Sequence, residues 1–311
     1  MPVNETLATY SDWLYRSALG VYLFAIMLYA VEQAFARAPR KKAEALVGAG
    51  APIPGIITDE PKQPKSELSR TERIGRMGAA LTVLGALLHL GSLVMRGLSA
   101  GRAPWGNMYE YMSLLCLAAV VTWIVLMAKF PIRRLGAFVL TPILVLLFLG
   151  GTVLYAESAP VQPALRSYWL VIHVSVISIS SGVLLVPGVT SILYLLKDTD
   201  GERFPKLPSA DVLDRMSYRT TVLAFPLFTA GIICGAIWAE AAWGRFWGWD
   251  PKETVAFVCW VVYAAYLHAR ATAGWRGRGA AWINIAGFAL NVFNLFFINL
   301  VTSGLHSYAG L

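Results

Sequence analysis

The feature that most constrains this chain is a series of eight long apolar segments. The hydrocarbon core of a bilayer is about 30 Å thick, and a helix needs about 20 mostly apolar residues to cross it. Segments of that length cover residues 17–35, 76–96, 109–128, 135–154, 169–196, 218–239, 254–270 and 282–302. Lipid offers no partner for unpaired backbone groups, and these runs are too long for barrel strands. The sequence therefore predicts an all-α, polytopic membrane protein with about eight transmembrane helices.

Composition agrees with this fold class. Of the 311 residues, 57% are hydrophobic and 14% are charged, and the mean hydropathy is +0.58. Soluble domains contain about 25% charged residues, so an ordinary cytoplasmic enzyme is excluded. The three cysteines, Cys116, Cys234 and Cys259, lie in apolar runs without a C-x-x-C pair. They predict neither a disulfide framework nor a zinc site, and they read as small hydrophobic residues within helices.

Basic residues predict the orientation of the chain in the membrane. Of the 26 Lys and Arg residues, 20 fall in or beside four alternate loops, residues 37–76, 129–134, 197–219 and 270–278. Cytoplasmic loops carry such an excess, so we expect these loops inside and both termini outside. The net charge of +8 is then a consequence of topology, and no nucleic-acid partner is expected.

The chain divides into three parts. Residues 1–36 form an N-terminal segment with the first transmembrane helix, and residues 76–311 form a seven-helix bundle. Residues 37–75 are rich in Pro, Gly, Ala and Lys, which is typical of a flexible cytoplasmic linker.

The predicted external loop at residues 238–253 is unusually rich in tryptophan. Four of the eleven tryptophans, Trp238, Trp243, Trp247 and Trp249, lie within twelve residues, with glycines between them. One interpretation is an aromatic belt at the headgroups. Belts do not need glycines, however, whereas tight turns that aim flat rings one way suit a planar apolar ligand. We favour a ligand platform.

Asp250 ends that loop and has a structural interpretation. In Asp250-Pro251-Lys252-Glu253 an N-cap residue precedes Pro at the first helical position and Glu at the third. This pattern predicts a capping box at the start of the seventh helix.

The four histidines differ in predicted depth. His173 and His306 share the external level of the tryptophan loop, which favours a bis-histidine metal or haem site over two merely hydrogen-bonded side chains. His268 lies near the inner end of the seventh helix. His89, in the outer half of the second helix, either packs against neighbouring helices or is a further ligand.

Two other groups of polar residues are interpreted as structural. Asn284, Asn291 and Asn294 recur at helical spacing on the eighth helix, and we favour contacts between helices over ligand contact. Glu110 lies at the start of the third helix, where a negative charge suits the positive helix end.

Several of these stretches together resemble a known family. W-G-R-F-W-G-W-D-P-K-E-T (243–254) and A-A-Y-L-H-A-R (264–270) are similar to the WWD signature of haem-handling proteins. N-M-Y-E-Y, P-A-L-R-S-Y-W-L-V-I-H-V-S (163–175) and I-N-L-V-T-S-G-L-H-S-Y (298–308) agree with it. The match runs from about residue 76 onward and resembles the CcsA family, also called ResC, of system II cytochrome c maturation.

The resemblance implies a haem channel and cytochrome c synthase, with haem b as substrate and ligand. Haem is exported and then held outside the membrane, and its vinyl groups are joined by thioether bonds to the cysteines of a CXXCH apocytochrome. The expected site consists of two axial ligands, His173 and His306, with Asp250 and flat stacking of the porphyrin on Trp243, Trp247 and Trp249. His268 matches an inner haem ligand whose partner histidine comes from a CcsB or ResB companion.

The same resemblance implies partners and a location. We expect a CcsB/ResB-like membrane protein, which makes the synthase active, a CXXCH apocytochrome and a thioredoxin-like thiol reductant. The expected location is the bacterial plasma membrane with the active face outside, with a thylakoid as the alternative. Two other functions stay open: haem delivery without synthesis, and secondary transport of a small solute, although no matching inverted halves are visible.

Overall fold

The computed structural model describes residues 3–35, 69–161, 165–200, 204–272 and 274–306. These residues form helices and contain no strand. The elements are α1 (Glu5–Phe35), α2 (Arg70–Ala100), α3 (Met108–Lys129), η1 (Arg133–Leu135), α4 (Gly136–Thr152), α5 (Tyr168–Thr199), α6 (Ala210–Trp243), α7 (Pro251–Thr272), α8 (Arg278–Phe293) and η3 (Asn294–Ile298). Eight helical segments in the described part are long and apolar enough to cross a membrane. The predicted all-α membrane fold is confirmed.

The first two helices begin earlier than predicted. α1 begins at Glu5 rather than residue 17, because its polar start continues a buried stripe at spacings of three and four. That stripe consists of Ser11, Tyr15, Ala18, Tyr22, Ala25, Tyr29 and Glu32. α2 begins at Arg70, where Ser69 and Glu72 form a capping box. Residues 70–75, assigned to the linker, are therefore helical, and most of the linker, residues 36–68, lies outside the described residues.

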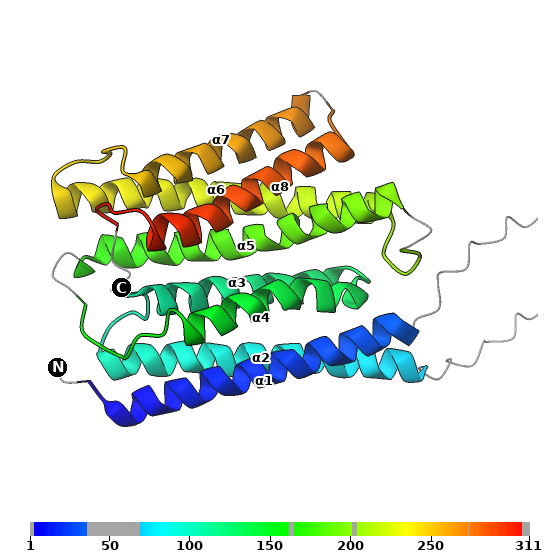
Figure 1. Ribbon diagram of the computed structural model, residues 1–311, viewed down its shortest axis with the longest axis horizontal. Helices are drawn as coiled ribbons and strands as arrows, with labels where there is room; N and C mark the ends of the chain where they lie inside the picture. Colours follow the sequence, from blue (N-terminus) through cyan, green and yellow to red (C-terminus); the bar gives the residue numbers. More distant parts are fainter. Residues whose placement is uncertain (1–2, 36–68, 162–164, 201–203, 273, 307–311) are drawn as a thin grey trace, which may run out of the picture.

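The helices form an elongated bundle of two halves (Figure 1). α1 to α4 lie on one side and α5 to α8 on the other, and α3 packs against α5. One end, which we call the tryptophan-loop end, carries residues 101–107, 153–161, 244–250 and 299–306. The opposite end carries residues 130–132 and 204–209. The start of α1 lies at the tryptophan-loop end, and which end faces the cytoplasm stays a prediction.

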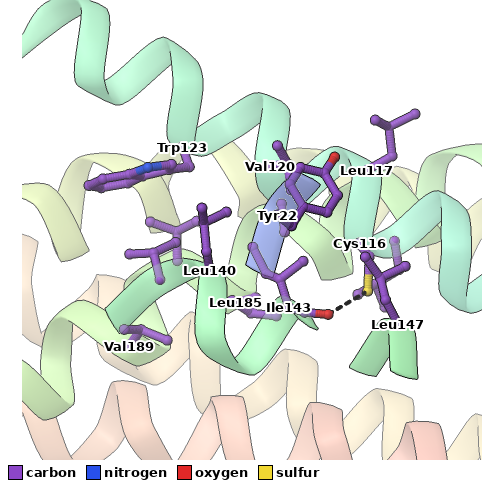
Figure 2. Packing of buried hydrophobic residues seen from close by; sticks show 14 of the residues in the cluster. Tyr22, Cys116, Leu117, Val120, Trp123, Leu140, Ile143, Leu147, Leu185 and Val189 are labelled. Carbon is purple, nitrogen blue, oxygen red and sulfur yellow. Dashed lines mark hydrogen bonds between the residues drawn. The ribbon is translucent and has the colours of Figure 1, made fainter. Parts of the chain in front are cut away.

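Buried apolar side chains fill the space between α1, α3, α4 and α5 (Figure 2). Trp123 and Leu140 are fully buried there, as is Cys116, whose Sγ lies 3.9 Å from the Ile143 carbonyl oxygen. Cys116 and Cys259 are buried within helices, as the sequence predicted, while Cys234 is partly exposed.

Polar contacts join the helices within this apolar frame. His89 is fully buried, with Nε2 2.8 Å from Ser113 Oγ and Nδ1 3.5 Å from Tyr22 Oη. It therefore packs between α1, α2 and α3, which is the first of its two predicted alternatives. Asn284 Nδ2 donates to Thr221 Oγ1 at 2.9 Å and joins α8 to α6, which confirms the helix-contact interpretation for that residue.

Candidate functional site

A cavity opens at the tryptophan-loop end of the bundle. It holds about 1250 Å³ of empty space, including its open mouth. Its walls come from the loop before α3, from α3, α5 and α6, from the tryptophan loop and α7, and from η3 and His306. Binding pockets for small molecules are mostly apolar with a few polar groups. The lining of this cavity has that composition.

His173 enters the cavity from α5 through a slot in α6. Its Nδ1 lies 2.8 Å from the carbonyl oxygen of Gly231, which can only accept, so Nδ1 carries the proton. The slot exists because α6 has glycine at 235, where a Cβ would lie 2.6 Å from His173 Cε1. With Nδ1 fixed as the donor, the Nε2 lone pair is left for a ligand.

His306 reaches the same cavity from the segment that follows η3. Its Nδ1 lies 3.4 Å from Asp250 Oδ2, and its side chain is 17% exposed. Gly304 allows this approach, because a Cβ there would lie 2.7 Å from Asp250 Oδ2. Burial lowers the pKa of His306 below its ordinary value of 6.5, with Lys252 adding to the effect and Asp250 opposing it. The imidazole is therefore neutral at pH 7, as a metal ligand must be.

Trp238 lies between the two histidines. The His173 ring stacks on its indole, with centroids 6.1 Å apart and planes inclined by 8°. His306 meets the indole edge-on at 5.8 Å, and Trp243 lies 5.0 Å from His306. The sequence placed Trp238 in the tryptophan loop, as part of the ligand platform, but not among the three rings expected to stack on the porphyrin. α6 instead continues to Trp243, so the connecting loop spans only residues 244–250.

The other two tryptophans do not form a flat shelf with Trp243. Trp247 lines the cavity, but Trp249 stands at 88° to it, is 66% exposed and packs against Phe257. The expected arrangement, with the rings of all three facing one way, is therefore not found. Trp249 adopts φ 57°, a left-handed conformation that costs a bulky residue about 1–2 kcal/mol. This backbone turns the side chain of Trp249 out of the cavity.

Asp250 and Glu253 hold the tryptophan loop and the last described residues together. Glu253 Oε2 accepts hydrogen bonds from the backbone N–H groups of Gly248 and Asp250, at 2.9 and 3.1 Å. Asp250 Oδ1 accepts from Lys252 N at 3.4 Å, and Oδ2 accepts from Leu305 N at 3.1 Å. Asp250 and Glu253 therefore form the predicted cap at the start of α7. Asp250 thereby also positions the segment that carries His306.

A buried ionic cluster fixes the loop before α3. Glu110 is fully buried and binds both Arg96, at 3.2 Å, and Arg102, at 2.7 Å. It also accepts from Gly106 N at 2.7 Å, and Gly106 and Trp105 line the cavity. Glu110 is thus more than the helix-end charge that the sequence suggested, because it positions one wall of the site. Two arginines, eight and fourteen residues before one acid, were the sequence signal for this cluster.

His268 lies apart from this site. It is exposed on α7, far along the helix from Lys252 and Glu253, and it does not line the cavity. Asn291, Asn294 and Asn299, in contrast, do line the cavity. For Asn291 and Asn294, the interpretation as simple contacts between helices is incomplete.

Residues 105–306 match the family described as cytochrome C assembly protein. The CcsA cytochrome c biogenesis protein of Parasynechococcus marenigrum (strain WH8102) is 36% identical over 264 residues, covering 73% of this chain and 85% of that protein. The CcsA of Synechococcus sp. (strain CC9311) is 33% identical over 331 aligned positions, covering 93% and 96%. The chain belongs to the CcsA family of cytochrome c biogenesis proteins.

A solved structure, titled cytochrome c heme lyase CcmF, has the same fold with a TM-score of 0.64 at 17% sequence identity. The similarity covers 99% of this chain and 49% of CcmF, so the chain spans about half the length of that protein. The residues that match the cytochrome C assembly family, 105–306, include both histidines, the tryptophan loop and the residues that line the cavity. These comparisons support cytochrome c maturation rather than solute transport, the alternative that the sequence left open.

Proposed function

We propose that the cavity at the tryptophan-loop end binds haem b between His173 and His306 and presents it for attachment to apocytochrome c. The observation that carries the proposal is that two imidazoles from different parts of the chain line one cavity. His173 Nδ1 lies in a hydrogen bond with the Gly231 carbonyl, which leaves Nε2 for a metal, whereas His306 Nδ1 lies 3.4 Å from Asp250 Oδ2 without a hydrogen bond. Haem iron takes two axial imidazoles in many proteins.

The proposed reaction is the covalent attachment of haem to a CXXCH apocytochrome. A cysteine S–H adds across a haem vinyl group, so that sulfur bonds to one carbon and hydrogen to the other, with no net oxidation or reduction. The protein's contribution is positioning, because holding the vinyl and the thiol in place removes most of the entropic barrier. Trp238, Trp243 and Trp247 restrict the ligand in the cavity, while Glu110 and its arginines fix the facing loop.

Activity is proposed to require a CcsB/ResB-like membrane partner and a thiol reductant of the thioredoxin class. The exposed position of His268 on α7 supports a second haem ligand set shared with that partner. α7 is also the least buried of the spanning helices in the described part of the chain, which leaves room for a protein neighbour. The proposed location is the bacterial plasma membrane, with the tryptophan-loop end outside.

Absorption spectra of the detergent-purified protein test the proposal. We compare the parent with His173→Ala and His306→Ala, each expressed with and without a CcsB-like partner. The expected parent spectrum is that of reduced low-spin haem, and each variant should lose or shift it and fail to mature a CXXCH reporter. His268→Ala is the matched control, and without the partner its spectrum should equal that of the parent. A colourless parent, or normal maturation in either outer variant, would contradict the proposal.

A further inference from the structure

We propose that Lys252 binds a propionate of the haem and so fixes which edge of the macrocycle faces the incoming cysteines. This inference rests on the proposed function, because it takes haem as the occupant of the cavity. It assigns a role to a residue that the axial ligands and the tryptophans leave unused.

Lys252 places a cation on a wall of the cavity without an acidic partner. Its side chain lines the cavity from the first turn of α7, and its Nζ donates to Asn299 Oδ1 at 2.6 Å. An ammonium group has three donors, so two are left for a ligand. Within the described residues, no carboxylate lies within 4 Å of Nζ. A sheltered charge of this kind is costly unless an anion pairs with it.

Asn299 is held so that it can orient the ammonium group. Its Nδ2 donates to the carbonyl oxygens of Leu295, at 2.6 Å, and Asn294, at 3.3 Å. Both carbonyls belong to residues 294–298, which form a π-helix, a rare element that is frequent at functional sites. The amide oxygen of Asn299 is thereby directed at Lys252.

The acidic groups near Lys252 are already occupied. Glu253 uses Oε2 for the N–H groups of Gly248 and Asp250. Asp250 binds Leu305 N and faces His306. Neither is a direct partner of the ammonium group, so a ligand carboxylate has no competitor in contact with Nζ.

A second donor lines the same cavity. Asn291 accepts from Ser181 Oγ through Oδ1 at 3.4 Å, which leaves its Nδ2 as a donor beside the cavity. The lining also includes the apolar side chains Leu170, Ile177 and Phe228. Haem b likewise combines two charged propionates on one edge with apolar vinyl groups elsewhere on the ring. Lys252 therefore favours the propionate edge and leaves the vinyl groups away from its ammonium group.

The test compares haem with its dimethyl ester, in which both propionates are neutral. The full-length protein in detergent is titrated with each compound, and the dissociation constants are measured from absorbance for the parent and for Lys252→Met. Truncating one member of a sheltered charge pair typically costs about 2–5 kcal/mol, or at least tenfold in affinity. We expect the parent to prefer haem over the ester by about tenfold or more, and Lys252→Met to lose that preference.

Two further variants make the result specific. Lys252→Arg keeps a cation and should retain the preference for haem over the ester. That result would show that the charge of residue 252, rather than its packing, determines the preference. Lys129→Met, at the opposite end of α3, is the matched control and should behave as the parent.

Three other results of the titrations would each contradict a specific part of the proposal. Equal affinity of the parent for haem and ester overturns propionate recognition. A preference that survives in a folded Lys252→Met protein overturns the role of Lys252. A parent that binds neither compound overturns the proposed function as well.

Discussion

The imidazole of His173 lies parallel to the indole of Trp238, inclined by 8°, while Gly231 and Gly235 of α6 border the same ring. His173 is thus confined by the indole and by a helix backbone. The slot depends on the missing side chain at 235 as much as on the histidine itself. That dependence gives a way to move a proposed ligand without changing the histidine itself.

Gly235→Ala should displace His173. The added Cβ would lie 2.6 Å from His173 Cε1, which is closer than real contacts allow, so the ring must move. We expect loss of the low-spin haem spectrum with the helix content unchanged. Gly20→Ala is the matched control, because a Cβ there meets nothing within 4 Å. That substitution should stabilise α1 by about 0.5–1 kcal/mol, and a normal spectrum in Gly235→Ala would contradict the slot.

Substitution of Asp250 should separate capping from ligand positioning. Asn retains one acceptor oxygen, which can serve either the N-cap or Leu305 N, whereas Ala retains none. We expect Asp250→Asn to keep the thermal stability within about 1 kcal/mol and to weaken haem binding moderately. Asp250→Ala should weaken binding further, because the segment with His306 loses its anchor. Haem titrations and thermal melts of both variants measure the difference, and equal binding in both would count against the anchor.

Haem binding should persist below the ordinary pKa of histidine. The folded pKa of His306 is lowered from 6.5 by burial, so its imidazole stays neutral as the pH falls through 6.5. Protonation, and with it loss of iron ligation, then occurs only at lower pH. An absorbance titration from pH 8 to 4 should show the low-spin spectrum lost with a midpoint below pH 6.5. Loss of the spectrum centred at pH 6.5 or higher would contradict the sheltered position of His306.

The buried ionic cluster should contribute more to stability than an exposed pair. Glu110→Gln leaves Arg96 and Arg102 buried without their shared carboxylate, and breaking such a pair costs about 3–5 kcal/mol. Asp198→Asn removes the more exposed pair with Arg278, which should cost less than about 1 kcal/mol. Thermal melts in detergent should show a clearly lower midpoint for Glu110→Gln. Similar midpoints would mean that the cluster adds little stability.

The membrane fold could be predicted from the sequence because length and hydropathy define spanning helices directly. The predicted helix ends were less accurate, because the position of a helix end depends on packing rather than on hydropathy. α1 starts at Glu5 because Ser11 and Tyr15 continue its buried stripe, although the surrounding residues are polar. In the same way, α6 runs on to Trp243 because Trp238 packs inward against His173 and His306.

The candidate site could be predicted in its composition but not in its arrangement. The sequence indicated His173, His306 and the tryptophan loop, because rare residue types stand out at one level of the bundle. It could not indicate that Trp249 turns outward, since that depends on one left-handed residue. Nor could it indicate that Lys252 meets Asn299, because that contact joins positions 47 residues apart.

The two proposed ligands are attached to the protein in very different ways. His173 lies within the long helix α5 and is enclosed by α6, whereas His306 follows η3 on a short segment whose contacts include Asp250. The barrier to withdrawing an imidazole scales with the structure that must move with it, so His306 should dissociate far faster than His173. The protein would then have one permanent and one exchangeable coordination position. Product would depart from the His306 side, with the order of ligand release set by the flexibility of the chain rather than by bond strength.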